Sequence, residues 1–184
     1  AAAVAARLGI EPGVASRGMA KARPDFGSLR VWRAARSGEA GDRLLVSAFA
    51  ANDPDSTRRV VDGLAGTGLV DGRGRVGILN LREDRGDRTL QWLDAVRDGR
   101  LSDFDEIVLV GTPARAALRR LSKGRPSAAR PRVSFSARKD PAGLMASLPA
   151  VRNGRSVVVG LGNMGGLGEA LVEHWRTIGE PYGA

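Results

Sequence analysis

The chain has 184 residues, a length typical of one domain, and it lacks cysteine, which excludes disulfides, thiolate metal sites and cysteine catalysis. A single histidine, His174, excludes any site that needs two imidazoles. The net charge is +9, but the cations are mostly arginines spread along the chain and aromatic residues make up only 4%, so we expect exposed arginine faces and no specific nucleic-acid site.

The first residues have the composition of two short helices. An alanine-rich helix is expected over Ala1–Leu8, with no initiator methionine before it, and a second around Gly13–Ala20. The Pro and Gly residues of Arg23–Gly27 indicate a linker. We therefore expect a fragment in which residues 1–27 are the end of a truncated domain plus a linker, and residues 28–184 form the next domain.

From residue 29 onward, short apolar stretches alternate with amphipathic ones. Strands are expected at Leu29–Ala35, Arg43–Ala50, Val76–Leu81, Glu106–Val110, Arg132–Ser136 and Ser156–Val159. Helices are expected at Pro54–Leu64, Arg88–Val96, Pro113–Leu121, Pro141–Leu148 and Leu167–Ile178. Asp53, Thr112 and Asp140, each followed by proline, are expected to cap three of these helices. The alternation predicts an α/β fold, with a mostly parallel sheet covered by helices on both faces.

Ligands of such sheets bind beyond the carboxyl ends of the strands, so the loops there carry the candidate residues. These loops are Ala51–Asp55, Arg82–Asp87, Gly111–Pro113 and Gly160–Gly166. In the first loop, capping explains Asp53 and the helix dipole explains Asp55, but neither explains Asn52. Two carboxylates there disfavour a phosphate and suit a ribose hydroxyl, an ammonium group or an arginine.

The second loop, within Asn80–Arg88, carries six charges of both signs. One interpretation is an arginine cluster that binds a phosphate or a carboxylate and is oriented by Asp84. The other is a solvated turn in which Asp87 caps the next helix.

The last loop, Gly160–Gly166, contains a literal G-x-G-x-x-G. In dinucleotide-binding proteins that pattern occupies the first β–α turn and precedes an acidic residue on the next strand. Here it follows the last expected strand, so the context argues against NAD or FAD. Close approach of the backbone to another ligand, or tight packing, remains open.

Three ordered motifs resemble a known family. They are FAANDPDST at Phe49–Thr57, NLREDRGDRT at Asn80–Thr89 and GLGNMGG at Gly160–Gly166. Together they resemble the C-terminal part of the poly-γ-glutamate synthase ligase subunit, the CapB/PgsB family, which is similar to Mur-type amide ligases. Ala1–Ile10 resembles the end of that family's central ATPase domain, and Asp25–Arg30 falls at the interdomain segment.

The resemblance implies a three-layer, Rossmann-like domain of an ATP-dependent amide ligase that acts in capsule formation. A glutamate carboxylate would be activated as an acyl phosphate and then attacked by the amine of the incoming glutamate. ATP and Mg²⁺ would be bound mainly outside this chain, which contains no G-x-x-x-x-G-K-[ST]. The implied partners are glutamate or poly-γ-glutamate and other subunits of a membrane-associated synthase. The implied location is cytoplasmic, at the membrane.

The resemblance also implies site residues. Arg85 is the candidate catalytic residue, and no metal ligand is expected in this chain. Nucleotide- or substrate-binding roles fall on Arg30, Asn52, Asp53, Arg82, Asp84, Arg85, Arg88, Gly160, Gly162 and Asn163. Asn163 and Met164 stand where Mur ligases carry a His-Glu pair.

Three functions remain open at this point. The first is the C-terminal domain of a poly-γ-glutamate-type ligase, inactive without its ATPase domain. The second is a stand-alone α/β module that binds an anion or a partner without catalysis. The third is a nucleotide-binding oxidoreductase domain.

Overall fold

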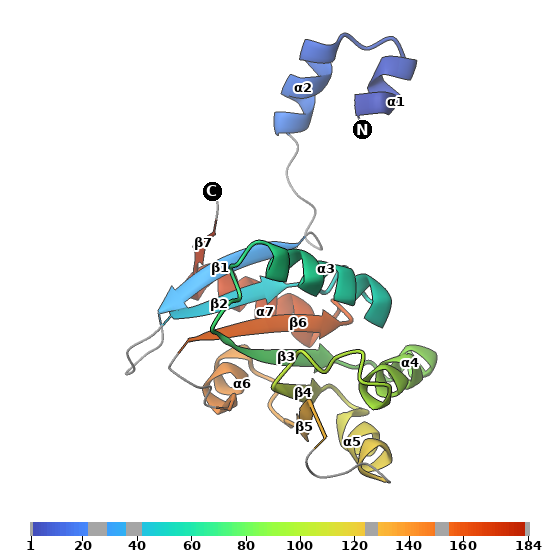
Figure 1. Cartoon of the computed structure of the whole chain (residues 1–184), viewed down its shortest axis with the longest axis vertical. Helices are drawn as coiled ribbons and strands as arrows, with labels where there is room; N and C mark the ends of the chain where they lie inside the picture. Colours follow the sequence, from blue (N-terminus) through green and yellow to red (C-terminus); the bar gives the residue numbers. More distant parts are fainter. Residues whose placement is uncertain (1, 22–28, 36–41, 124–128, 150–154, 183–184) are drawn as a thin grey trace.

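The computed structural model describes residues 2–21, 29–35, 42–123, 129–149 and 155–182. Its main body is a seven-stranded sheet in the order β5-β4-β3-β6-β2-β1-β7 (Figure 1). The strands are β1 Arg30–Ala35, β2 Asp42–Ser47, β3 Gly74–Asn80, β4 Glu106–Val110, β5 Arg132–Phe135, β6 Ser156–Gly162 and β7 Glu180–Pro181. The helices are α1 Ala2–Arg7, α2 Pro12–Lys21, α3 Pro54–Gly66, α4 Gly86–Arg97, α5 Ala114–Ser122, α6 Pro141–Ser147 and α7 Leu167–Ile178.

The sheet is mostly parallel, as the alternation predicts. Strands β2 to β6 pair in parallel, and β1 pairs antiparallel with both β2 and β7. Strand β7 was missed from the sequence because two residues after a glycine carry no periodic signal. The three-layer α/β prediction is confirmed.

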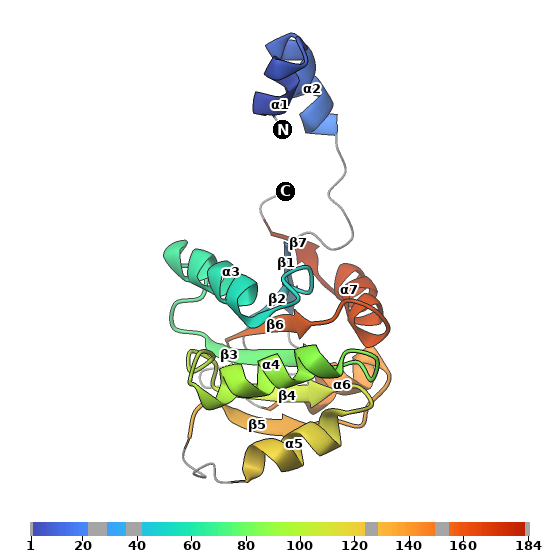
Figure 2. The same ribbon diagram turned by 90° about the vertical axis from the view of Figure 1, so that its right-hand side faces the viewer.

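Helices cover both faces of the sheet. Figure 2 shows α3, α4 and α5 on one face and α6 and α7 on the other. A separate apolar core fills each interface; Trp92 is fully buried in the first and Trp175 in the second. The central strands are buried on both faces, and all seven residues of β6 are buried. This explains their continuous apolar composition.

Two of the three predicted caps are confirmed. The Asp53 carboxylate accepts from the backbone N–H groups of Asp55 and Ser56, and Asp140 accepts from the N–H of Gly143. The prediction for Thr112 is wrong, because α5 begins after Pro113 and has no side-chain cap. A backbone turn takes over that role: the N–H of Ala114 donates to the carbonyl of Gly111 at 3.1 Å.

The two N-terminal helices α1 and α2 contain no buried residue, and Figure 1 shows them apart from the sheet. The predicted linker Arg23–Gly27 and the domain boundary after residue 27 lie outside the described residues. Among the helices that are described, none combines the length and apolar composition needed to cross a membrane.

Candidate functional site

The topology singles out the neighbouring strands β3 and β6. The helix after β3, α4, lies on one face of the sheet, whereas the helix after β6, α7, lies on the other (Figure 2). The two following loops therefore diverge from adjacent strand ends. Open α/β sheets bind their ligands at such a switch point.

Asn80, the last residue of β3, ties these two loops together. Its side chain is 2% exposed, and Nδ2 donates to the carbonyls of Asn163 at 2.7 Å and Gly165 at 3.1 Å. In return, the backbone N–H and Nδ2 of Asn163 donate to the Asn80 carbonyl at 3.0 and 3.2 Å. Sequence reasoning did not name Asn80 as a site residue, although a polar residue that ends an apolar strand was an available signal.

We expect Asn80→Ala to destabilise the protein by about 1–3 kcal/mol, because two partly buried carbonyls lose the donor that the buried Asn80 side chain supplies. Asn163→Ala is the matched control, since it removes one side-chain donor and keeps the backbone hydrogen bond. Urea unfolding of both variants measures the difference. A loss in Asn80→Ala no larger than in the control contradicts this role.

The glycines of β6 serve packing. The loop predicted to begin at Gly160 begins only after Gly162, because the strand continues to that residue. Gly160 is buried, and a Cβ built on it would lie 2.3 Å from the ring of Phe49. Gly162 has a φ of +82°, and a Cβ on it would lie 2.6 Å from the carbonyl oxygen of Asn80. The Phe49 ring occupies the space beside Gly160, which accounts for the glycine by packing; its role as a binding residue stays a prediction.

A fork between Arg82 and Asp84 dominates the second loop. Nε and Nη2 of Arg82 donate to the two carboxylate oxygens at 2.9 and 2.8 Å. The Arg82 hydrogen bonds hold the pKa of Asp84 below its usual value. Arg82 also lies against the loop after β6, because a Cβ on Gly165 would be 2.6 Å from its Nη1. The fork thus joins both loops of the switch point.

Arg85 is less constrained. Its Nε lies 3.9 Å from Asp84, and its side chain is 52% exposed. Within the expected arginine cluster, Asp84 forms its two-pronged pair with Arg82 and makes only the longer contact with Arg85. Asp87 does not cap α4 either: the helix begins at Gly86, which places Asp87 in its first turn. Arg85 is a cation at a strand end with room for an anionic ligand.

Arg88 connects α4 to the first candidate loop. It lies inside the helix, and its Nη1 donates to the carbonyl oxygen of Asn52 at 3.2 Å and to the Asn52 side-chain oxygen. This contact explains Asn52, which capping leaves unexplained. The pKa of Asp53 is lowered, first by the Ser56 N–H and further by the charge of Arg88.

The structure gathers most of the predicted residues at one edge. Arg30 pairs in register with Ser47 at the end of β2, so it shares that edge with the loops after β2, β3 and β6. Among the described residues, no three His, Asp or Glu side chains lie close enough to hold a metal ion. Because Arg82 is paired with Asp84 and Arg88 with Asn52, the arrangement can bind an anion through Arg85; within the described part, it offers no metal centre.

Comparisons with known proteins show the family of this chain. Residues 34–178 match the model of the poly-gamma-glutamate synthase CapB C-terminal domain. The chain is 42% identical over 93 residues to the capsule biosynthesis protein CapB of Bacillus anthracis, covering 49% of this chain and 19% of that protein. It is 30% identical over 170 residues to PGA synthase CapB of Bacillus subtilis (strain 168), covering 92% of this chain and 41% of that protein. The matches thus span less than half the length of either relative.

Proposed function

Because this chain belongs to the family of poly-gamma-glutamate synthase CapB C-terminal domains, we propose that it is the C-terminal domain of an ATP-dependent acid–amino acid ligase that makes poly-γ-glutamate. The similarity to a PGA synthase and to a capsule biosynthesis protein supports the polymer as product. The observation that carries the proposal is the arginine cluster of Arg82 and Arg85 at the switch point of the sheet.

The proposed reaction forms an amide bond in two steps. A carboxylate oxygen of the glutamate or poly-γ-glutamate substrate attacks the terminal phosphorus of ATP, which gives an acyl phosphate and ADP. The amine of the incoming glutamate then attacks the acyl carbon and the C–N bond forms. The bond between the acyl carbon and the phosphate oxygen breaks, phosphate leaves with the electron pair, and the nitrogen loses a proton. Negative charge builds up on the acyl and phosphate oxygens, where a preorganised arginine stabilises it.

Within this chain, the Arg82–Asp84 fork holds the loop and Arg85 contacts the developing charge. The fork fixes the position of residue 85, whose N–H donates to the carbonyl of Arg82 at 3.2 Å. Mg²⁺ and most contacts to the nucleotide belong, in this proposal, to an ATPase domain outside the chain. The other proposed partners are subunits of a synthase at the cytoplasmic face of the membrane.

The alternative of an anion-binding module without catalysis keeps one supporting observation. Arg85 is exposed, and among the described residues no two-pronged partner holds it. An accessible arginine is all that anion binding without catalysis would require. The two functions differ in whether an anion bound here is consumed.

We expect the purified 184-residue chain to release no phosphate from ATP in the presence of glutamate, because its sequence has no P-loop to hold the β- and γ-phosphates. The same domain joined to its ATPase domain is expected to release phosphate and form γ-glutamyl bonds. A phosphate assay measures the release, and the mass of the products shows whether γ-glutamyl bonds have formed. Glutamate-dependent release by the isolated chain above that of its Arg85→Ala variant contradicts the first expectation, and a joined protein that binds glutamate without forming bonds supports the module instead.

A further inference from the structure

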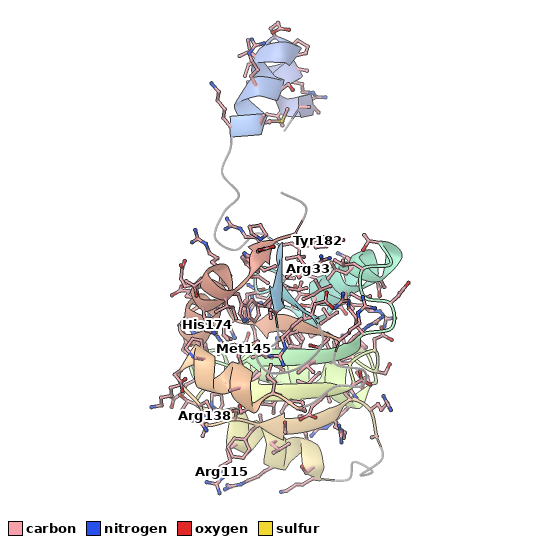
Figure 3. The ribbon with its side chains drawn as sticks, turned by 90° about the vertical axis from the view of Figure 1, so that its left-hand side faces the viewer. Arg33, Arg115, Arg138, Met145, His174 and Tyr182 are labelled. Carbon is pink, nitrogen blue, oxygen red and sulfur yellow. The ribbon has the colours of Figure 1, made fainter. Side chains whose placement is uncertain are left out.

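Three cations lie on the same edge of the sheet as the candidate site, next to it on the side of β4 and β5. Arg115 is the second residue of α5, which begins after β4, and Arg138 and Lys139 follow β5. Strands β4 and β5 are parallel neighbours, so their carboxyl ends share this edge. Figure 3 shows Arg115 and Arg138 on the same side of the molecule. We call Arg115, Arg138 and Lys139 the basic edge.

The members of the basic edge carry uncompensated charge. All three are exposed, and among the described residues none of them has an acidic partner at ion-pair distance. The neighbouring carboxylate, Asp140, is engaged as the cap of α6 through the N–H of Gly143. With three cations and this one carboxylate, the edge stays net positive and can attract an external anion.

The opposite end of the sheet is different. At the amino end of β2, Asp42 lies within ion-pair distance of Arg33, Arg73 and Arg155. At the amino end of β4, Glu106 pairs with Arg132. The arginines around Asp42 and Glu106 are therefore used for structure. Among the described residues, exposed cations without an acidic partner also occur at Arg59, Arg119 and Arg120, so what distinguishes the basic edge is its position beside the candidate site.

Along the carboxyl edge, the charge also changes from β2 to β5. After β2, Asp55 meets Arg100 at 3.1 Å and Asp53 lies in the field of Arg88. After β3, Arg85 is held only at 3.9 Å by Asp84. The loop after β3 balances its three cations with Glu83, Asp84 and Asp87, so the edge becomes net positive only further along, after β4 and β5.

We propose that the basic edge binds the growing poly-γ-glutamate chain and leads it away from the site toward β5. The inference rests on the proposed function and adds where the polymer lies. Poly-γ-glutamate carries a free carboxylate on every residue, so it matches a row of separate exposed cations better than a single small anion does. Each exposed ion pair is weak, but linked carboxylates bind with a high effective concentration.

The binding test uses the 184-residue chain with fluorescently labelled poly-γ-glutamate. We expect the triple variant Arg115→Ser, Arg138→Ser and Lys139→Ser to bind the polymer about tenfold more weakly than the original chain, the combined effect of three exposed ion pairs. The matched control replaces Arg7, Arg17 and Arg59 by serine; these residues are exposed and lie off this edge. Both variants have the same net charge, and we expect the control to change affinity less than threefold.

Three results would overturn the proposal. The first is an equal loss of polymer affinity in the two triple variants, which would mean attraction by net charge alone. The second is undiminished polymer binding by the basic-edge variant. The third is tighter binding of duplex DNA than of the polymer through the same three residues. Anisotropy titrations at two salt concentrations measure all three.

A second measurement separates this inference from the proposed function. In the domain joined to its ATPase domain, the basic-edge variant is expected to couple a glutamate dimer at the original rate but to release shorter polymers. Bond formation with an unchanged polymer length overturns the inference and leaves the function intact. Absence of any γ-glutamyl bond in the unsubstituted joined protein overturns the function itself, whereas the binding test still decides the basic edge.

Discussion

Arg85→Ala in the complete ligase is expected to lower turnover by about 10²-fold, the scale of losing one preorganised electrostatic donor. Arg85 lies in the loop after β3, directly before α4; its side chain is 52% exposed and is held by Asp84 only at 3.9 Å. It therefore has donors left for a phosphate or carboxylate oxygen. The Arg82–Asp84 fork is independent of Arg85 and stays in place, so the loop keeps its shape in the variant.

Stability separates a binding role from a structural one. The thermal midpoint of Arg85→Ala should barely move, since an exposed ion pair contributes about 0–1 kcal/mol. Arg85→Lys should recover little turnover, because an ammonium group does not reproduce a two-pronged fork. Arg59→Ala is the matched control, an exposed arginine in the middle of α3 outside the loops of the candidate site, and should leave turnover unchanged. Normal turnover in Arg85→Ala, or lost turnover with a collapsed midpoint, returns this loop to a solvated turn.

Gly162→Ala is expected to destabilise the protein by about 3 kcal/mol, from two added costs. A left-handed backbone at φ +82° is unfavourable for alanine, and its Cβ would lie 2.6 Å from the Asn80 carbonyl oxygen. That oxygen accepts both hydrogen bonds from Asn163, so the backbone shift would also loosen the loop after β6. The thermal midpoint should fall by about 6–12 °C for a protein of this size.

Gly72→Ala isolates the backbone cost. Gly72 has a φ of +65° and nothing within 4 Å of a built Cβ, so only the left-handed conformation is penalised, by about 1–2 kcal/mol. Thermal and urea unfolding of both variants give the difference. Equal losses at the two positions would show that the close approach of β6 to Asn80 relaxes without cost.

The sequence by itself determined the fold class and most elements. Apolar stretches of strand length and amphipathic stretches of helix length have different periods, which are local properties. Helix α7 and strand β4 have the bounds expected from this signal. The caps Asp53 and Asp140 were equally local, since each acts on backbone groups two or three residues ahead.

The candidate site was only partly available from the sequence. The charged loop after β3 and the glycines of β6 stood out by composition, but their partners did not. Asp84 had several arginines within reach along the chain, and exposed pairs differ by fractions of about 1 kcal/mol, so no local rule selects Arg82 over Arg85. Likewise, the strand expected to stop before Gly160 continues because its neighbours supply ladder partners as far as Gly162.

The tertiary structure decided the order of the strands and therefore the contacts between residues far apart in the sequence. Strand β6, late in the chain, inserts between β3 and β2, and this places Asn80 beside Asn163 although they are 83 residues apart. The same insertion sets Gly160 against Phe49 and brings Arg82 onto Gly165. Such contacts depend on which strands are neighbours, a choice made by the packing of the whole sheet against its two helical layers. Periodicity carries no information about it, because every buried parallel strand has the same apolar pattern.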